Sequence, residues 1–378
     1  MAKKFTMRTK DQVVQEIETG LKNNVSANYK RGVMMNVDPV IVQTTEEKIR
    51  QSYKFWDMIS VIPTLDSMGQ ILSLAEGQSV GQRTAVSADG TGNFMRRPVE
   101  VGGFSGRDFV TKEVEFDVKI PWATITQWGL NSAPAYDLYR NFIMRSRAMS
   151  RFRIGFYGQC QNPATNSNLT TYPLMQDVKK GWIQYMIDNY PQMVLGITMG
   201  GSTAKGYDIN PIKVGAGGDF QSMAQLIDYL KNHMIPRIYR ANTSIQAFLG
   251  DSLKNADVNR IIAAAGSEAI QLSAVESLMQ LTTIGNVPAY TPDEFPERGV
   301  IVTDPLNMQF IYQIQSAERS LENSADKKGL VDYLLLQVDY VIREVKACAM
   351  VHPDAIKLPG ATAGTWVDAS EVWAISPV

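Results

Sequence analysis

The chain has 378 residues, 44% of them hydrophobic and 20% charged, and a formal net charge of −1. This composition fits a globular protein of roughly two or three compact lobes, and the near-zero charge excludes a global field that draws the chain onto nucleic acid or a membrane. Cys160 and Cys348 are too few for a disulfide framework, and no apolar run approaches the roughly 20 residues of a membrane helix. The N-terminus lacks a signal-peptide core, so we expect cytoplasm-like surroundings.

The N-terminal 60 residues combine a basic end with a short amphipathic segment. The basic side chains of the first ten residues, which include no acid, are Lys3, Lys4, Arg8 and Lys10. A solvated tail is favoured over contact with an anionic partner. Residues 11–22 predict a helix, and the stretch that follows is interpreted as an arm that needs a partner surface. The apolar face of the helix consists of Val13, Val14, Ile17 and Leu21.

Residues 61–121 predict a long, two-stranded excursion with a glycine-rich tip. The sequence DGTGN at 89–93 is a strong turn signal. Apolar and charged residues then alternate, as in a strand with one apolar face. The apolar positions are Val114, Phe116, Val118 and Ile120. Because an isolated two-stranded hairpin is marginal in water, we expect it to lie on its own domain or on a neighbouring subunit.

A long helix is predicted from Pro134 to Tyr157, with Ser132 as its N-cap. At about 100° per residue, one stripe of this helix is apolar. The stripe consists of Leu138, Phe142, Met149, Phe152 and Phe156. The opposite side carries Arg140, Arg147 and Arg151. A solvated face is the default interpretation of these arginines, and an anion-facing surface is the alternative.

Residues 172–230 contain two amphipathic helix signals separated by glycine-rich turns. The first helix is expected to begin at Pro173, which suits a first helical turn, and to end before Pro191. The second follows the glycine-rich turn at 215–218, with Asp219 as its predicted N-cap.

A glycine-rich turn before a helix can bind phosphate, but both turns in this segment depart from the known patterns. Phe220 stands where the third glycine of a dinucleotide fingerprint belongs, and Asp219 would repel phosphate. Ser202 replaces the obligatory lysine of the Walker-like stretch 196–203. Tight turns are therefore favoured over phosphate loops in both places.

Residues 244–329 predict an α/β lobe. Short apolar strands are expected at 245–249 and 300–302, and helices at 257–265 and 269–281.

Residues 330–351 are strongly β-prone and predict one major strand, bent where the alternation slips near Glu344. The tail 357–378 is rich in glycine, alanine and proline, but it carries apolar side chains that indicate docking. These side chains are Trp366, Val367, Val372 and Trp373.

Patterns for catalysis and metal binding are sparse. Cys348 and His352 would share a strand face but lack further ligands at familiar spacing, so a buried thiol beside a histidine is favoured over a metal pair. Asp293, Glu294 and Glu297 are interpreted as a solvated acidic loop and not as acid–base catalysts. We therefore predict no catalytic, cofactor-binding or metal-binding residue and no cofactor.

Motifs spread along the chain carry a family resemblance. The motifs are YPLMQDVKKGWIQ (172–184), VGAGGDFQSMAQLI (214–227), IGNVPAYTPDEFP (284–296) and VDYVIREVKACAMV (338–351). In their order and spacing they resemble the major capsid proteins of tailed bacteriophages, in the family typified by the temperate myophage P2, over residues 40–356. The resemblance implies an α+β chain with the HK97-like capsid fold and a structural protein, not an enzyme.

The resemblance also implies a domain for each segment. In chain order these are an N-terminal arm (1–60), an E-loop hairpin across a neighbouring subunit (61–121), a peripheral domain with a long spine helix (122–243 and 330–356), an axial domain at the five-fold and six-fold axes (244–329) and an unassigned C-terminal tail (357–378). Some shells of this fold are crosslinked by a lysine–asparagine bond from the E-loop. The absence of lysine between Lys54 and Lys112 argues against such a bond here.

The implied function is that of a major capsid protein, which self-assembles as pentamers and hexamers into an icosahedral head shell around double-stranded DNA. The implied partners are other copies of the chain, a scaffolding protein, a prohead protease, the portal and non-specifically bound DNA, with no membrane. The implied location is the virion, with the host cytoplasm during assembly. The candidates for inter-subunit contact are Arg83, Arg96, Arg97 and Arg107. The candidates for an interior or DNA-facing surface are Arg140, Arg147 and Arg151.

Two alternatives remain from the residues themselves. One is an α/β enzyme that binds an anionic substrate at the glycine turns of 196–219. The other is a monomeric DNA-binding protein that uses the basic N-terminus and the arginines of 140–151, with binding that weakens steeply as salt rises.

Overall fold

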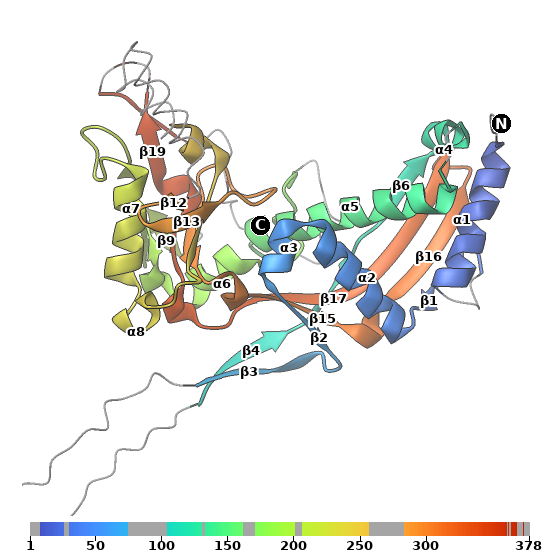
Figure 1. Cartoon of the computed structure of the whole chain (residues 1–378), viewed down its shortest axis with the longest axis horizontal. Coiled ribbons are helices and arrows are strands. Elements are labelled where there is room, and N and C mark those ends of the chain that lie inside the picture. Colours follow the sequence, from blue (N-terminus) through green and yellow to red (C-terminus); the bar gives the residue numbers. More distant parts are fainter. Residues whose placement is uncertain are drawn as a thin grey trace, which may run out of the picture.

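The chain folds into an elongated α+β body with a lobe at each end and a thin hairpin that projects from its middle (Figure 1). The computed structural model describes residues 8–25, 30–74, 104–130, 133–161, 171–200, 206–256, 283–360, 362, 364–368 and 373.

The larger sheet is built on one long strand, β17 (Gly329–Ile342). The other strands described in this sheet are β1 (Met35–Asn36), β2 (Ser60–Thr64), β5 (Lys112–Glu115), β6 (Val118–Pro121), β15 (Met308–Gln313) and β16 (Glu318–Ser324). Their order is β1-β16-β17-β15-β2, and β5 and β6 pair with the remaining edge of β17. β17 is antiparallel to β15 and β16, whereas β2 is parallel to β15.

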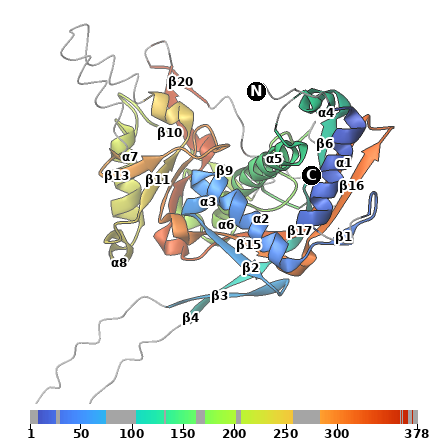
Figure 2. The ribbon, with the colours of Figure 1, turned by 45° about the vertical axis from the view of Figure 1, so that its right-hand side comes forward.

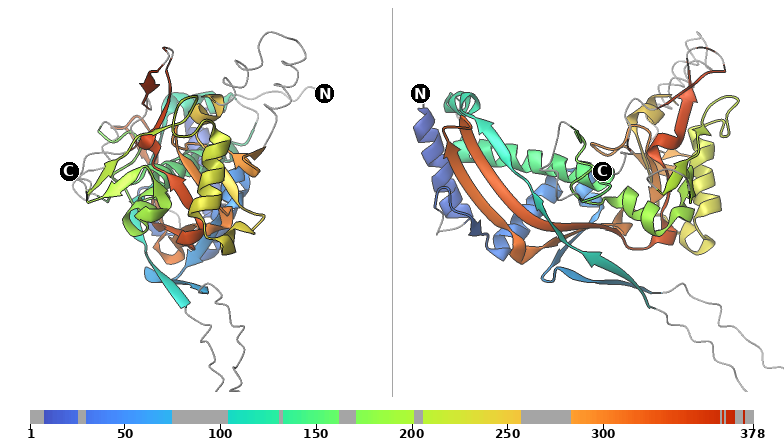
Figure 3. Two further views of the ribbon diagram at one scale, coloured as in Figure 1. Left: turned by 90° about the vertical axis from the view of Figure 1, so that its left-hand side faces the viewer. Right: turned by 180° about the vertical axis from the view of Figure 1, so that it is seen from behind.

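A 23-residue helix, α5 (Ala135–Tyr157), runs along this sheet (Figure 3). The predicted helix is confirmed, but Pro134 is its N-cap; Ser132 lies outside the described residues. The predicted apolar stripe is wrong at Phe142, which is 41% exposed, while the buried face includes Ile143. The face is rotated because two of the arginines find acidic partners in the interior, as described below.

The N-terminal helices pack on the same lobe. They are α1 (Lys10–Asn24), α2 (Pro39–Ser52), α3 (Lys54–Met58) and α4 (Trp122–Gly129). The predicted helix at 11–22 is confirmed as α1, and its apolar face is buried. Figure 2 shows α2 and α3 beside α5. The described part of the first 60 residues therefore finds packing surface within its own chain.

The smaller lobe surrounds a second sheet. Its described strands, in spatial order, are β12 (Thr283–Ile284), β13 (Val287–Tyr290), β11 (Gln246–Leu249), β14 (Val300–Thr303), β18 (Ala349–Val351) and β7 (Val194–Leu195). The predicted strands at 245–249 and 300–302 are confirmed as β11 and β14. The helices expected at 257–265 and 269–281 lie outside the described residues.

The chain crosses between the two sheets at positions that differ from those predicted. The expected lobe 244–329 does not match the division of the sheets, because β15 and β16 join the larger sheet. The expected single strand 330–351 is also wrong. β17 ends at Ile342, and the chain continues through a 3₁₀ turn, η5 (Val345–Ala347), into β18 of the other sheet. The side-chain amide of Asn307 holds this crossing, because it donates to the Glu344 carbonyl (2.8 Å) and accepts from the Glu344 N–H (2.6 Å).

The two helices predicted within 172–230 are shorter than expected. Residues 172–181 form turns, so the first helix, α6 (Trp182–Asn189), begins at Trp182 and not at Pro173. The second helix, α7 (Met223–Tyr229), has Ser222 as its N-cap. Asp219 instead accepts a hydrogen bond from the Lys213 N–H (2.9 Å), so its side chain closes a turn before the helix.

A buried aromatic cluster joins the lobes into one core. The rings at this junction belong to Phe55, Trp56, Phe152, Phe156, Trp182, Phe310 and Tyr340. Trp182 also donates its indole N–H to the Gln309 carbonyl (3.0 Å), which satisfies the polar edge of the ring. No described helix has the length and apolar character needed to cross a membrane.

Candidate assembly surfaces and the contacts that position them

The projecting hairpin consists of β3 (Met68–Leu74) and β4 (Phe104–Val110). The strands pair along their whole length, from Met68 opposite Val110 to Leu74 opposite Phe104. The hairpin leaves the body near the middle of the larger sheet (Figure 1). Met68 is 66% exposed and Leu72 is 58% exposed. A two-stranded hairpin is only marginally stable in water, and exposed apolar side chains mark interaction sites. The exposed residues of this hairpin are therefore candidates for contact with another molecule.

The excursion is narrower than the predicted range 61–121. The flanking strands β2, β5 and β6 belong to the larger sheet. The alternating residues that predicted a hairpin strand, such as Val114 and Ile120, therefore point into the core of the body, where both are buried. The glycine-rich tip falls in 75–103, outside the described residues.

A buried ion pair holds the base of the hairpin. Lys179 Nζ lies 2.9 Å from Asp339 Oδ1, and the two side chains are only 10% and 12% exposed. Asp339 accepts the backbone N–H of Val110 (2.9 Å), and Lys179 donates to the carbonyl of the same residue (2.9 Å). On the neighbouring strand end, the Thr111 N–H and hydroxyl both donate to the Ser67 carbonyl (2.8 and 2.9 Å).

The arginines expected at inter-subunit contacts are only partly visible. Arg83, Arg96 and Arg97 lie outside the described residues. Arg107 lies on β4, with its guanidinium carbon 4.8 Å from the centre of the Tyr190 ring. The Arg107 guanidinium thus makes a cation–π contact within its own chain, and this contact stabilises the position of the hairpin against the body.

A buried charge cluster connects α5 to the larger sheet. Asp332 on β17 is fully buried and receives hydrogen bonds from Arg319 Nε (3.0 Å), Arg319 Nη2 (2.6 Å) and the Tyr139 hydroxyl (2.5 Å). Arg147 Nη2 lies 3.1 Å from Asp332 Oδ1, the oxygen that also accepts from Arg319 Nε. Burial alone would raise the pKa of Asp332, but Arg147, Arg319 and the hydrogen bonds outweigh burial and lower the pKa to about 2. Burial lowers the pKa of Arg147 and raises that of Tyr139.

A second buried pair connects α5 to α2. Arg151 binds Glu46 through both carboxylate oxygens, one of them 2.7 Å from Nη2. The guanidinium of Arg151 also lies over the rings of Phe116 and Phe310, at 5.3 and 5.4 Å. The planar group is thus sandwiched and bidentate, the geometry that suits arginine in an interior.

The expectation of an interior or DNA-facing arginine surface is therefore wrong for two of its three residues. Arg147 and Arg151 are buried within the subunit, and their charges are matched by Asp332 and Glu46. Arg140 is different, because its side chain is 39% exposed and lies 3.5 Å from Asp137.

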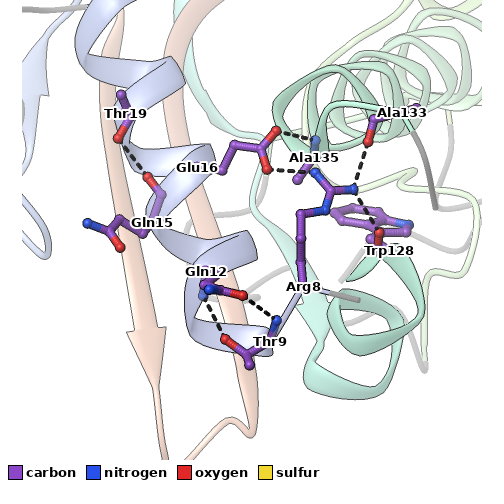
Figure 4. A network of polar contacts seen from close by, with 9 residues as sticks. All are labelled: Arg8, Thr9, Gln12, Gln15, Glu16, Thr19, Trp128, Ala133 and Ala135. Carbon is purple, nitrogen blue, oxygen red and sulfur yellow. Dashed lines mark hydrogen bonds and ion pairs between the residues drawn. The ribbon is translucent and has the colours of Figure 1, made fainter. Parts of the chain in front are cut away.

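Arg8, the first described residue, also binds its own chain (Figure 4), whereas Lys3 and Lys4 lie outside the described residues. Arg8 bridges Glu16 (2.7 Å) and the carbonyls of Trp128 (3.2 Å) and Ala133 (2.8 Å). The other Glu16 oxygen accepts the Ala135 N–H (2.8 Å), at the first turn of α5. A capping box between Thr9 and Gln12 starts α1. These contacts fasten α1 to the beginning of α5.

The C-terminal part of the chain packs against one side of the glycine-rich turn at 215–218. A Cβ on Gly215, where φ is +149°, would lie 2.3 Å from the Pro359 ring. The C-terminal strand β19 (Ile356–Pro359) runs parallel to β10 (Ile212–Lys213), so the tail covers this turn. The turn is thus packed at Gly215 and Gly218, whereas a Cβ on Gly217 would meet open space.

Cys348 and His352 are both buried and form part of the packed interior. Burial raises the pKa of the Cys348 thiol to about 12. His352 accepts the Asp354 N–H at Nδ1 (3.2 Å), and its Nε2 lies 3.4 Å from the Tyr207 hydroxyl. In the described part of the chain, no three His, Cys, Asp or Glu side chains are arranged to hold a metal. The acidic loop is partly structural as well, because Glu294 pairs with Arg153 on α5 (2.6 Å).

The described part of the C-terminal tail docks through Trp373, as expected, whereas the prediction is wrong for Val367, which is 49% exposed. Trp373 is 1% exposed, and its indole N–H donates to the Phe156 carbonyl (2.8 Å). Its backbone N–H donates to Asp354 (2.8 Å), and its carbonyl accepts from Gln159 and Gln176. Trp366, on β20 (Trp366–Val367), pairs with β19, whereas Val372 lies outside the described residues.

The chain matches known proteins along most of its length. A model of a family described as the phage major capsid protein, P2 family, matches residues 14–353. The capsid proteins of Escherichia phage P2 are 23% identical over 316 residues, which cover 84% of this chain and 86% of that protein. The major capsid protein of Serratia phage KSP20 is 21% identical over 319 residues, with coverages of 83% and 87%.

A solved structure shares the fold. A chain in the satellite phage P4 procapsid, which includes a size determination protein, superposes with a TM-score of 0.68 at 22% identity. The match covers 87% of this chain and 94% of that one. The arrangement of the sheets, the long helix and the hairpin is therefore that of a phage shell subunit.

Proposed function

The chain belongs to the P2 family of phage major capsid proteins, and from this premise we propose how one copy joins the next in the shell. As a family member it is a structural component of a tailed phage head that assembles with itself, not an enzyme. We propose that its copies form pentamers and hexamers, and that the β3–β4 hairpin of each copy lies across a neighbour as the E-loop. Membership of this family overturns the alternative of an enzyme that binds an anionic substrate at 196–219.

We assign the two lobes to the two domains of the capsid fold. The lobe with the larger sheet and α5 would be the peripheral domain, and the lobe with β11, β13 and α7 the axial domain near the symmetry axes. The division of the sheets supports this assignment. It moves β15 and β16 out of the axial domain that was expected to span 244–329.

The exposed hairpin is the observation that carries the proposal. Met68 and Leu72 stand in water on a two-stranded arm that reaches beyond the body. Burial of apolar area stabilises association by about 25 cal/mol per Å². Each contact is modest, but it is repeated by every copy around a closed shell.

We further infer the partners implied by the family resemblance: a scaffolding protein, a prohead protease, the portal, and packaged double-stranded DNA. The P4 procapsid includes a size determination protein, so a procapsid of this fold can hold a second protein. For DNA, the net charge of −1 and the exposed Arg140 fit weak, non-specific contact.

Replacing residues 75–103 by an Asn-Gly turn tests the role of the hairpin. Leu74 pairs with Phe104, so a two-residue turn can close the ladder there. We expect a folded protein with an unchanged melting temperature that forms no closed shells in negative-stain electron microscopy, because the contact across subunits is lost.

The matched control replaces the exposed Lys346 by Gln, far from the hairpin, and should leave shells intact. Closed shells from the shortened protein would show that the hairpin is dispensable. A shortened protein that does not fold would be recognised by its melting curve, and the exposed-face variant Met68→Glu/Leu72→Glu then gives the same test without a deletion.

A further inference from the structure

The sequence motif at 172–181 has a position in the fold that the capsid role by itself does not explain. It forms turns where the sequence predicts a helix, yet several of its polar side chains are buried. Gln176 is 3% exposed, Asp177 is 3% exposed and Lys179 is 8% exposed. Burying a lysine is costly unless it is paired and hydrogen-bonded, so the location of its partners indicates what the loop does.

The partners of Lys179 lie at the place where the hairpin leaves the body. Its ammonium group binds the Val110 carbonyl and the Asp339 carboxylate, both at 2.9 Å, and Asp339 in turn accepts the Val110 N–H. Lys179 and Asp339 thus bind both backbone polar groups of Val110, its carbonyl and its N–H. Val110 is the last residue of β4, and Asp339 lies three residues before the end of β17, so the two side chains join the root of the hairpin to the longest described strand of the body.

The loop that carries Lys179 is itself fixed to the end of α5. A Cβ on Gly158 would lie 1.9 Å from the Lys179 carbonyl oxygen, and a Cβ on Gly181 would lie 2.2 Å from the Gly155 oxygen. The Gly181 N–H donates to the Gly158 carbonyl (2.9 Å). Glycine is needed at both positions because the two backbones touch. The position of the ammonium group is therefore determined by the end of the long helix.

We propose that Lys179 and Asp339 are positioning residues, which set the direction in which the β3–β4 hairpin leaves the subunit. A hairpin held only by its two connecting strands could swing about its base. Two charge-assisted hydrogen bonds to Val110, in a nearly water-free place, remove that freedom. The inference rests on the proposed role of the hairpin as the contact between subunits, because its direction then determines which part of a neighbour it meets.

The direction of the hairpin can be measured by pulsed electron–electron spin resonance on the unassembled full-length protein. Spin labels would be placed at Leu72→Cys on the hairpin and Gln127→Cys on α4, both exposed positions, with Cys160 replaced by Ser. Cys348 is fully buried and remains. The distribution of label distances reports how widely the hairpin moves relative to the body.

Lys179→Met keeps the aliphatic stem and removes the ammonium group. We expect the distance distribution to become at least about twice as wide, because the Val110 carbonyl loses its donor and Asp339 is left as a buried carboxylate without its counter-charge, which destabilises the anchored arrangement. Lys179→Arg keeps a cation and should restore part of the narrow distribution. The matched control is Lys180→Met, since the neighbouring lysine pairs with Asp188 on the surface (2.5 Å) and does not touch the hairpin.

A narrow distribution in Lys179→Met would overturn the proposal. If Lys179→Met does not fold, Asp339→Ala replaces it, because this change removes both the partner of Lys179 and the acceptor of the Val110 N–H. An unchanged distribution there would equally overturn the proposal. These measurements do not depend on assembly. If the wild type holds a narrow distribution and forms no shells, the proposed contact between subunits fails while the positioning role stands.

Discussion

The two acids of β17 interrupt an otherwise apolar strand, and each has a cationic partner. Asp332 binds Arg147 and Arg319, and Asp339 binds Lys179. A lone carboxylate in such a strand would be costly. The sequence signal that could have revealed these sites is the occurrence of aspartate within the run LVDYLLLQVDY, which requires partners that the sequence does not identify.

Asp332 makes the folded subunit sensitive to acid. Its pKa in the folded state is about 2, below the ordinary value of 3.8. A depressed carboxyl pKa stabilises the folded state above the unfolded-state pKa, and this contribution is lost as the pH falls through the folded-state value. We expect about 2 kcal/mol of the free energy of unfolding to disappear between about pH 5 and pH 2, as followed by denaturant unfolding at each pH.

Asp332→Asn should remove this part of the acid dependence. At neutral pH it should cost about 3–5 kcal/mol, because Arg147 and Arg319 remain buried without their counter-charge. Asp326→Asn, at an exposed turn beside the same sheet, is the control and should change stability by less than about 0.5 kcal/mol. If the free energy of unfolding of Asp332→Asn falls between about pH 5 and pH 2 as much as that of the wild type, Asp332 is not the source of the acid sensitivity.

Among the elements, α5 shows how an interior can choose the face of a helix. Counting apolar residues predicts a stripe that includes Phe142, but the structure buries Arg147 and Arg151. The arginines enter the core because Asp332 and Glu46 come from other elements, β17 and α2. Helical periodicity identifies the helix and not its orientation when buried ion pairs contribute.

The C-terminal tail acts as an element that closes the end of α5. Trp373 caps the Phe156 carbonyl and is buried beside His352. We expect Trp373→Ala to lower the free energy of unfolding by about 3–5 kcal/mol, because it leaves a large cavity. Thermal unfolding of the full-length protein measures the loss.

Two further variants separate packing from hydrogen bonding at this position. Trp373→Phe keeps most of the ring and should cost about 1–3 kcal/mol, mainly through the unsatisfied Phe156 carbonyl. Val367→Ala, at an exposed position of the same tail, should change stability by less than about 0.5 kcal/mol. Equal melting temperatures for Trp373→Ala and the wild type would mean that the tail does not close this end in solution.

At the scale of the described molecule, three of the cations that could have bound nucleic acid are instead paired within the subunit. Arg8, Arg147 and Arg151 have acidic partners in their own chain, and the net charge is −1. Association between copies should therefore rest on protein contacts. We expect capsomers or shells of the purified protein to survive nuclease treatment, as seen by negative-stain microscopy before and after digestion.

This expectation also separates the capsid assignment from the monomeric DNA-binding alternative. Particles that fall apart when nuclease is added, or a protein that is monomeric and binds DNA with a steep salt dependence, would contradict it. Arg140→Gln serves as the internal comparison, because Arg140 is the described member of the expected arginine face that remains partly exposed.

The sequence by itself determined the long helix, the N-terminal helix, the short strands of the smaller lobe and the family resemblance. These are local patterns of periodicity and turns, or motifs in a fixed order, and neither requires knowledge of distant partners. The same local patterns also favoured tight turns over a phosphate loop, since the missing lysine and glycine can be read directly from the chain.

Only the tertiary structure decided where β17 ends, which sheet each strand joins and which charges are buried. Each of these depends on residues far apart in the chain, such as Asn307 at the Glu344 crossing and Lys179 at Val110. A buried charge is tolerated only where a side chain of opposite charge lies next to it. Folding of the backbone places that side chain there, because it comes from a distant part of the chain. The hairpin shows both contributions, because the sequence predicted a two-stranded excursion between residues 61 and 121, while only the structure restricted its strands to 68–74 and 104–110 and placed Lys179 and Asp339 at its base.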